Sequence, residues 1–221
     1  DACSSDPHEK PQHPKAIPGD PSHALASMGV YVFSLPRLVQ LLEWDHDLAD
    51  SSHDFGKDIL PAIVNKHRVM AYRFGGPSGR VTADRYWRDV GTIDAYYDAN
   101  MDLLRPMPAM DLYQGDWSIR TYEGQYPPAR SVPGGSGREA DIANCMLASG
   151  TVVIGATVRH SILFPNVRVD EGAEVDNCLL FHGATVGAGA RVQRTIVDKG
   201  VSIPPGERIG FDREQDAARF T

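Results

Sequence analysis

The sequence predicts an α/β domain followed by a parallel β-helix, and three observations support this fold class. In the first half, apolar runs of strand character alternate with runs of helical spacing. After about residue 150, a short glycine-containing unit returns every 17 residues. A segment rich in proline and glycine lies between the two halves. We therefore divide the chain into an α/β portion (1–105), a wrapping linker (106–140), a β-helix (141–211) and a tail (212–221).

The first half contains alternating strands and helices. Runs rich in β-branched and aromatic residues are expected to form strands, and segments with leucines three or four apart are expected to form helices. In chain order we predict a strand at 27–33, helices at 36–45 and 55–66, strands at 68–74 and 85–90, and a helix at 92–104. Such alternation is typical of an α/β domain with a mixed sheet.

The second half repeats itself with a period of 17 residues. The unit "GATV" at 155–158 returns as "GAEV" (172–175), "GARV" (189–192) and "GERI" (206–209). Two further series of apolar positions share the period: Leu163, Leu180 and Val197, and Val169, Val186 and Ile203. Within one period the apolar positions are five, six and six residues apart, a rhythm that no α-helix or single strand gives. The pattern predicts a coil with three flat sides, one inward aliphatic residue on each, and glycine at a corner where φ is positive.

Composition limits the classes of partner. The formal charge is −7, with no block of like charges, which argues against nucleic acid or an anionic membrane as the main partner. No apolar run approaches the length of a membrane span, and the polar N-terminus is not a signal peptide. Cys3, Cys145 and Cys178 follow no metal-ligand spacing, so we expect free thiols in the cytoplasm.

Four residues of the first half are candidates for chemistry, and each has a structural alternative. Lys10 has the charge to bind a phosphate, or it is a solvated surface lysine. Asp89 offers a hard oxygen ligand to Mg²⁺, or it lies at the N-terminus of the helix at 92–104. Asp54 and Phe55 offer a carboxylate and a ring to a sugar, or Asp54 caps the helix that begins at 55.

The β-helix repeat permits a second class of function. In a hexapeptide-repeat acyltransferase, His160 or His182 would act as the general base. The alternative is that both histidines are surface residues. The glycine-rich runs at 75–80 and 134–138 do not join a strand to a helix, so we expect both to be loops.

The motifs of the first half resemble one family. The segments "EKP", "LASMGVYVF", "SSHDFGKDILP", "YWRDVGT" and "WSIRTY…PPAR" occur in this order before the repeats, and together they resemble the bacterial glucose-1-phosphate adenylyltransferases from residue 9 to 220. The resemblance implies a Rossmann-like nucleotidyltransferase domain joined to a left-handed β-helix. It also implies homotetramers that make ADP-glucose and pyrophosphate from ATP and glucose 1-phosphate in glycogen biosynthesis.

The resemblance assigns roles to matching residues. For glucose 1-phosphate, it implies binding by Glu9, Lys10, Ser27, Tyr31, Asp54, Phe55 and Trp87. Lys10 and Asp89 would be catalytic, with Asp89 as a ligand of Mg²⁺. Lys199 faces the allosteric site in the family pattern, where sugar-phosphate or AMP effectors bind.

The chain matches only part of the family pattern. The family begins with a glycine-rich ATP loop, and this sequence enters the pattern just before "EKP" and ends short of the last segment. We therefore expect the C-terminal half of the enzyme, inactive by itself, with residues 1–8 foreign to the pattern. A non-catalytic regulatory or scaffold subunit that assembles through its β-helix is the alternative.

Overall fold

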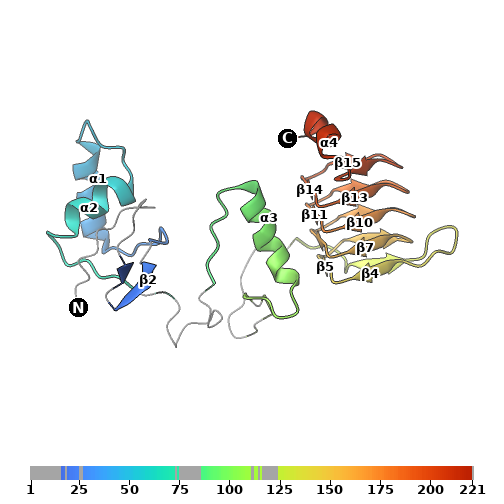
Figure 1. The fold of residues 1–221 in the computed structure, drawn as a ribbon, viewed down its shortest axis with the longest axis horizontal. Helices are drawn as coiled ribbons and strands as arrows, with labels where there is room; N and C mark the ends of the chain where they lie inside the picture. Colours follow the sequence, from blue (N-terminus) through green and yellow to red (C-terminus); the bar gives the residue numbers. More distant parts are fainter. Residues whose placement is uncertain are drawn as a thin grey trace. The chain divides into compact units, whose positions relative to one another are not determined.

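The structure, a computed structural model, forms two compact units, residues 1–73 and 74–221 (Figure 1). It describes residues 16–17, 19–24, 27–72, 74, 86–110, 112–113, 115 and 124–220. Within these ranges no helix is long and apolar enough to span a membrane.

The first unit packs short helices around a small apolar core. Strands β1 (Ala16–Ile17) and β2 (Asp20–Ala24) pair antiparallel. Helix α1 (Leu35–His46) carries a proline in its first turn, where the missing N–H costs nothing. A π-helical turn, η1 (Phe55–Ile59), runs directly into α2 (Leu60–Ile63). The buried core consists of Leu41, Ile59, Leu60 and Ile63, with Tyr31, Phe33, Phe55 and Val69 packed against it.

The predicted helices are confirmed, and the predicted strands of the first half are wrong. The segment at 36–45 is α1, and the segment at 55–66 is η1 with α2, which ends earlier, at Ile63. No strand forms within 27–33, 68–72 or 86–90 or at residue 74, the described parts of the three predicted strands. An extended segment becomes a strand only by hydrogen bonding to a neighbour. Among the described residues of this unit, β1 and β2 pair only with each other.

The second unit is a parallel β-helix, as the repeat predicts. Figure 1 shows the strands of successive coils stacked in layers. Three parallel sheets form its sides, in the orders β15-β12-β9-β6-β3, β16-β13-β10-β7-β4 and β14-β11-β8-β5. The strands are β3 (Arg130–Val132), β4 (Asp141–Ala143), β5 (Met146–Leu147), β6 (Val152–Ile154), β7 (Thr157–Arg159), β8 (Ile162–Leu163), β9 (Arg168–Val169), β10 (Glu174–Asp176), β11 (Leu179–Leu180), β12 (Thr185–Val186), β13 (Arg191–Gln193), β14 (Ile196–Val197), β15 (Ser202–Ile203) and β16 (Arg208–Ile209).

The register of the β-helix follows the repeat. Val175 pairs with Val158 on one neighbouring coil and with Val192 on the other. Of the predicted inward positions, Ile209 in the last coil is partly buried. The others are at most 5% exposed: Val158, Leu163, Val169, Val175, Leu180, Val186, Val192, Val197 and Ile203. One apolar ladder therefore runs down each side, and together the ladders fill the interior.

Each coil turns through corners in the left-handed backbone region. The predicted glycine corner is confirmed by positive φ at Gly155, Gly172, Gly189 and Gly206. The sequence analysis missed two other corners with positive φ, one at Asn144, His160, Asn177 and Arg194, and one at Gly150, Asn166, Gly183 and Gly200. Asparagine tolerates this region better than most residues do, which accounts for its presence at both.

Two helices accompany the β-helix. Helix α3 (Ile93–Met101) continues into the 3₁₀ turn η2 (Asp102–Leu104), which confirms the predicted helix at 92–104. Leu104 is buried with Ile162 and Leu179 of the β-helix. Helix α4 (Arg213–Arg219) follows the last coil, and its Asp216 accepts a hydrogen bond from the Gly210 N–H at 2.8 Å.

Candidate functional site

The first unit gathers a cluster of hydroxyl and aromatic side chains. The hydroxyls of Ser27 and Tyr31 lie 2.9 Å apart, within hydrogen-bonding distance. The Gly29 N–H also donates to Ser27 Oγ at 3.2 Å, which fixes the turn between them. The centroid of the Tyr31 ring lies 5.9 Å from that of the Phe55 ring, and the centroid of the Phe33 ring lies 5.8 Å from that of Phe55. The structure therefore brings together Ser27, Tyr31 and Phe55, three of the residues that the sequence singles out.

Asp54, which precedes Phe55, caps the helical segment that follows. Its Oδ1 accepts hydrogen bonds from the N–H groups of Gly56 at 2.8 Å and Lys57 at 2.9 Å. The capping alternative is thus present in the structure. Its other oxygen, Oδ2, lies 4.0 Å from Lys57 Nζ, and the side chain is 36% exposed. One carboxylate oxygen therefore remains outside the capping bonds.

A buried carboxylate on α1 holds the segment that leads to Asp54. Asp45 is 3% exposed. Its Oδ1 accepts the Ser51 hydroxyl at 2.6 Å, and its Oδ2 lies 2.8 Å from His53 Nδ1. The His53 N–H donates to Ser51 Oγ at 3.0 Å, which closes the network. The Ser51 hydroxyl and then the His53 ring lower the pKa of the Asp45 carboxyl below its usual value.

A second carboxylate reaches the same segment from η1. Asp58 Oδ2 accepts the Ser52 hydroxyl at 2.6 Å and the Asp54 N–H at 3.0 Å. These two donors lower the pKa of Asp58, with the Ser52 hydroxyl as the larger cause. The sequence analysis missed both Asp45 and Asp58. Two signals were available, because Asp45 lies on the buried face of α1 with Leu41, and Asp58 follows Asp54 at nearly capping-box spacing.

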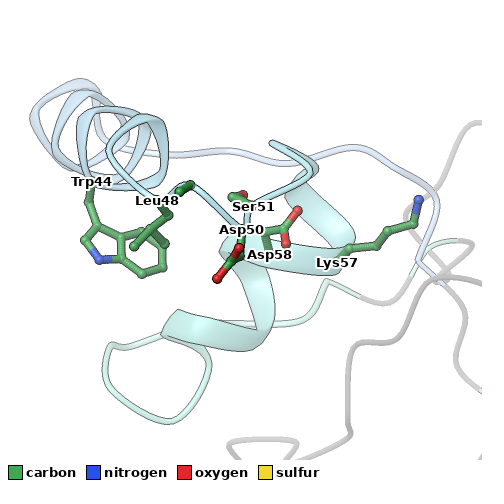
Figure 2. A pocket seen from close by; sticks show the side chains of 7 residues that line it. Trp44, Leu48, Asp50, Ser51, Lys57 and Asp58 are labelled. Atoms are coloured by element: carbon green, nitrogen blue, oxygen red, sulfur yellow. The ribbon is translucent and has the colours of Figure 1, made fainter.

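A shallow pocket of about 330 Å³ opens beside this network (Figure 2). Trp44 and Leu48 form its apolar part, and Asp50, Asp58 and Lys57 supply its charges. Ala49 and Ser51 complete the lining. None of the residues predicted to bind substrate lines it, so we do not assign this pocket to the predicted site.

Two further predicted residues belong to the second unit. Trp87 is 53% exposed, and its ring meets Phe74 edge-on at 6.1 Å. Asp89 Oδ1 accepts the Gly91 N–H at 3.0 Å, which forms a tight turn before α3. The helix cap itself is Thr92, whose Oγ1 accepts the Ala95 N–H at 3.1 Å. Asp89 is therefore part of the turn that leads into the helix.

Arg88, between these two residues, pairs with a buried carboxylate. Its Nη2 and Nε lie 2.6 and 3.1 Å from Asp102 Oδ2. Arg105 Nη2 lies 2.7 Å from the other oxygen of Asp102, which is 6% exposed. Asp102 and then the Tyr86 hydroxyl raise the pKa of Arg88. The sequence analysis missed Asp102, which fixes the segment around Trp87 and Asp89 against the end of α3.

Other predicted residues show no common site. Glu9 and Lys10 lie outside the described residues, and Lys199 is exposed on the β-helix. His160 Nδ1 lies 3.0 Å from Asp176 Oδ1, and the His182 ring lies 5.7 Å from that of Tyr126. The run at 134–138 is a loop, as predicted, and the run at 75–80 is outside the described ranges. Among described residues, no three histidines, cysteines or carboxylates gather as a metal site.

Comparison with protein families matches each half of the chain separately. Residues 6–105 match the family described as nucleotidyl transferase, and residues 127–221 match that described as GlmU-like, C-terminal hexapeptide. These matches confirm the nucleotidyltransferase portion and the β-helix portion of the predicted fold.

Curated relatives are similar over most of this chain. Glucose-1-phosphate adenylyltransferase 2 of Vibrio vulnificus (strain YJ016) is 56% identical over 160 residues, which cover 72% of this chain and 40% of the relative. Glucose-1-phosphate adenylyltransferase 2 of Vibrio cholerae is 52% identical over 163 residues, covering 74% and 40%. Glucose-1-phosphate adenylyltransferase of Methylobacillus flagellatus is 47% identical over 163 residues, covering 73% and 38%. The match thus spans about two fifths of these relatives' length.

Proposed function

We propose that this chain, a homologue of the glucose-1-phosphate adenylyltransferases that spans about two fifths of their length, is the part of such an enzyme that binds glucose 1-phosphate. The complete enzyme would transfer the adenylyl group of ATP to glucose 1-phosphate and release pyrophosphate, in the cytoplasm and in glycogen biosynthesis. The observation that carries the proposal is the contact of Ser27, Tyr31 and Phe55, with Asp54 adjacent.

The chemistry of this cluster suits a hexose. Two hydroxyls and a carboxylate oxygen exchange hydrogen bonds with sugar hydroxyls, and an aromatic wall covers the apolar face of the ring. Lys10 would hold the phosphate as a point charge, with Glu9 on the hydroxyls and Trp87 as a wall. The phosphate oxygen of glucose 1-phosphate then attacks the α-phosphorus of ATP in line. Catalysis of such a step depends mainly on positioning and charge neutralisation.

Asp89 is the proposed protein ligand of Mg²⁺. A magnesium ion is commonly bound by one or two carboxylates together with substrate phosphates and water. Among the described residues, no three histidines, cysteines or carboxylates gather, so Asp89 fits a site shared with phosphates and water and does not fit an all-protein metal cage. When bound, the ion would neutralise charge on the phosphates.

The ATP side, the assembly and the regulation belong to the same proposal. No glycine-rich run in this sequence joins a strand to a helix as a phosphate cradle does. We therefore expect the chain to bind glucose 1-phosphate and to form no ADP-glucose by itself. A homotetramer that assembles through the β-helix, and Lys199 as a contact for an anionic effector, complete the proposed enzyme.

Calorimetric titration of the chain with glucose 1-phosphate tests the proposal. Tyr31→Phe removes the hydroxyl that lies beside Ser27 and keeps the ring against Phe55. The affinity of this variant for glucose 1-phosphate should fall by about tenfold, which corresponds to the free energy of one hydrogen bond. Tyr72→Phe is the matched control, since Tyr72 is 86% exposed. Equal affinities of the two variants, or no binding by the unchanged chain, would contradict the proposed site.

A further inference from the structure

We propose that Asp45 and Asp58 are positioning residues, which together hold the segment 51–54 so that Asp54 and Phe55 are set for glucose 1-phosphate before it binds. We call this pair the carboxylate clamp. The inference rests on the proposed function, because it concerns the same site. Neither carboxylate needs to touch the sugar, since each acts through hydrogen bonds to the segment.

Asp45 fixes an unfavourable backbone conformation at His53. A buried carboxylate is costly unless it is hydrogen-bonded, and both oxygens of Asp45 bond to the segment 51–53. His53 has a φ of 57°, a left-handed conformation that non-glycine residues rarely adopt. The His53 ring bonds to Asp45, and the His53 backbone N–H bonds to Ser51. These two hydrogen bonds stabilise the strained backbone of His53, directly before Asp54.

Asp58 fixes Asp54 from the other side. It accepts the Asp54 N–H, while the Asp54 carboxylate caps Gly56 and Lys57. As in a capping box, a side chain inside the helical segment thus reaches back to the N–H of the N-cap residue. The Asp54 carbonyl also accepts the N–H of Asp58 at 2.9 Å. Hydrogen bonds therefore fix the position of both the backbone and the carboxylate of Asp54.

This geometry leads to Phe55 and its contact with Tyr31. Phe55 begins η1 immediately after the clamped segment, and its ring packs against both Tyr31 and Phe33. A site whose polar groups are already oriented loses less conformational freedom when a ligand binds. Loss of either clamp carboxylate should therefore weaken sugar binding without removing a group that contacts the sugar.

The clamp also determines the tautomer of His53. An ionised Asp45 carboxylate is only an acceptor, so His53 Nδ1 must carry the hydrogen in their 2.8 Å bond. In the neutral ring, Nε2 then carries the lone pair. Long-range ¹H–¹⁵N spectra of the ligand-free chain report this tautomer directly, independently of any substrate.

The experiment compares Asp45→Ala and Asp58→Ala, which remove every acceptor oxygen of the clamp residue, with Glu43→Gln, a loss of charge at an exposed position of the helix that carries Asp45. Titration with glucose 1-phosphate should show affinity about tenfold lower for both clamp variants, which corresponds to the free energy of about one hydrogen bond. Glu43→Gln should stay within about twofold of the unchanged chain. Of these variants, Asp45→Ala alone removes the acceptor of the His53 Nδ1–H, so it alone should lose the Nδ1–H tautomer of His53.

Amide exchange separates the failure of the clamp from the failure of the proposed function. The clamp predicts faster exchange at Gly56 and Lys57 in both clamp variants, and unchanged exchange in Glu43→Gln. If the unchanged chain binds no glucose 1-phosphate, the proposed function fails, and the exchange rates and tautomer alone decide on the clamp. The clamp would be overturned if both clamp variants showed the same affinity for glucose 1-phosphate and the same amide exchange rates as Glu43→Gln. If a clamp variant does not fold, it is replaced by Ser51→Ala, which removes two bonds of the network, or Ser52→Ala, which removes one, with the same expectations for affinity and amide exchange.

Discussion

The hydroxyl of Tyr97 donates a hydrogen bond to the carbonyl oxygen of Asn177 at 2.8 Å, and this bond joins α3 to a corner of the β-helix 80 residues away. Tyr97→Phe keeps the ring and leaves the carbonyl without this partner. We expect the variant to lose about 1 kcal/mol of unfolding free energy, measured by urea denaturation. Tyr96→Phe is the control, because the Tyr96 hydroxyl has no hydrogen bond to another described residue. Equal losses would mean that the bond contributes nothing.

Two corner glycines in equivalent coil positions should differ in their tolerance of alanine. Both Gly155 and Gly189 have positive φ, so alanine at either costs about 1 kcal/mol in backbone strain. A Cβ at Gly155 would also come within 2.8 Å of the Arg138 carbonyl oxygen, whereas one at Gly189 meets nothing within 4 Å. Gly155→Ala should therefore lose a further 1–3 kcal/mol, roughly the cost of overpacking. Thermal unfolding of the two variants provides the comparison, and equal melting temperatures would contradict it.

Cys178 should be inert to thiol reagents while the β-helix is folded. It is fully buried, and burial raises the pKa of its thiol to about 12. Only the thiolate reacts, so at pH 8 about one thiol in ten thousand is reactive even before access is considered. In a chain with Cys3→Ser and Cys145→Ser, labelling with a disulfide reagent should be slow in buffer and rapid in denaturant. Rapid labelling in buffer would show that the interior opens.

The loop at 134–138 should detach as the pH falls. Glu171 accepts hydrogen bonds from the Gly135 N–H at 2.9 Å, the Ser136 N–H at 3.0 Å and the Ser136 hydroxyl. These bonds, the Ser136 hydroxyl first, lower the pKa of Glu171 below its usual 4.5. For a lowered pKa, the stabilisation is complete above the unfolded value and is lost as pH falls through the folded value. Amide chemical shifts of Gly135 and Ser136 should therefore change only in acid, below about pH 4.5, and Glu171→Gln should abolish that transition.

Asp89 should control the metal requirement of a complete enzyme that carries this segment. Asp89→Asn keeps the shape of the turn to Gly91 and removes a hard anionic ligand. We expect kcat for ADP-glucose formation to fall by orders of magnitude and the Mg²⁺ concentration for half-maximal rate to rise. Asp94→Asn, in the exposed first turn of α3, is the control. Wild-type kinetics with a lowered melting temperature would assign Asp89 to the turn alone.

The β-helix could be predicted in detail because the same pattern of apolar and glycine positions occurs in several successive coils. One coil's pattern of inward Val175, corner Gly172 and inward Leu180 repeats on its neighbours, so chance matches are easily recognised. The corner at His160, Asn177 and Arg194 escaped prediction because its residue type changes from coil to coil, so no repeated residue marks the position.

The first half was less predictable, because its structure depends on contacts that a local pattern does not contain. The segment at 27–33 has strand composition, but no described neighbour pairs with it. Asp54 was rightly identified as a possible helix cap, whereas the sequence analysis did not single out Asp45 or Asp102. Each of these buried carboxylates pairs with a residue of a neighbouring segment, Asp45 with His53 and Asp102 with Arg88, and a local pattern does not show such pairs.

The register of the β-helix also has a consequence for how the chain reaches its native state. Residues paired along the ladders are 16 (Val152 with Arg168) to 22 (Arg130 with Val152) positions apart, whereas Tyr97 and Asn177 are separated by 80. Closing a short loop costs less entropy than closing a long one, and local contacts favour rapid folding. Folding can thus begin at any coil and proceed by adding one neighbouring coil at a time. Helix α3 would then dock late, on a surface that already exists.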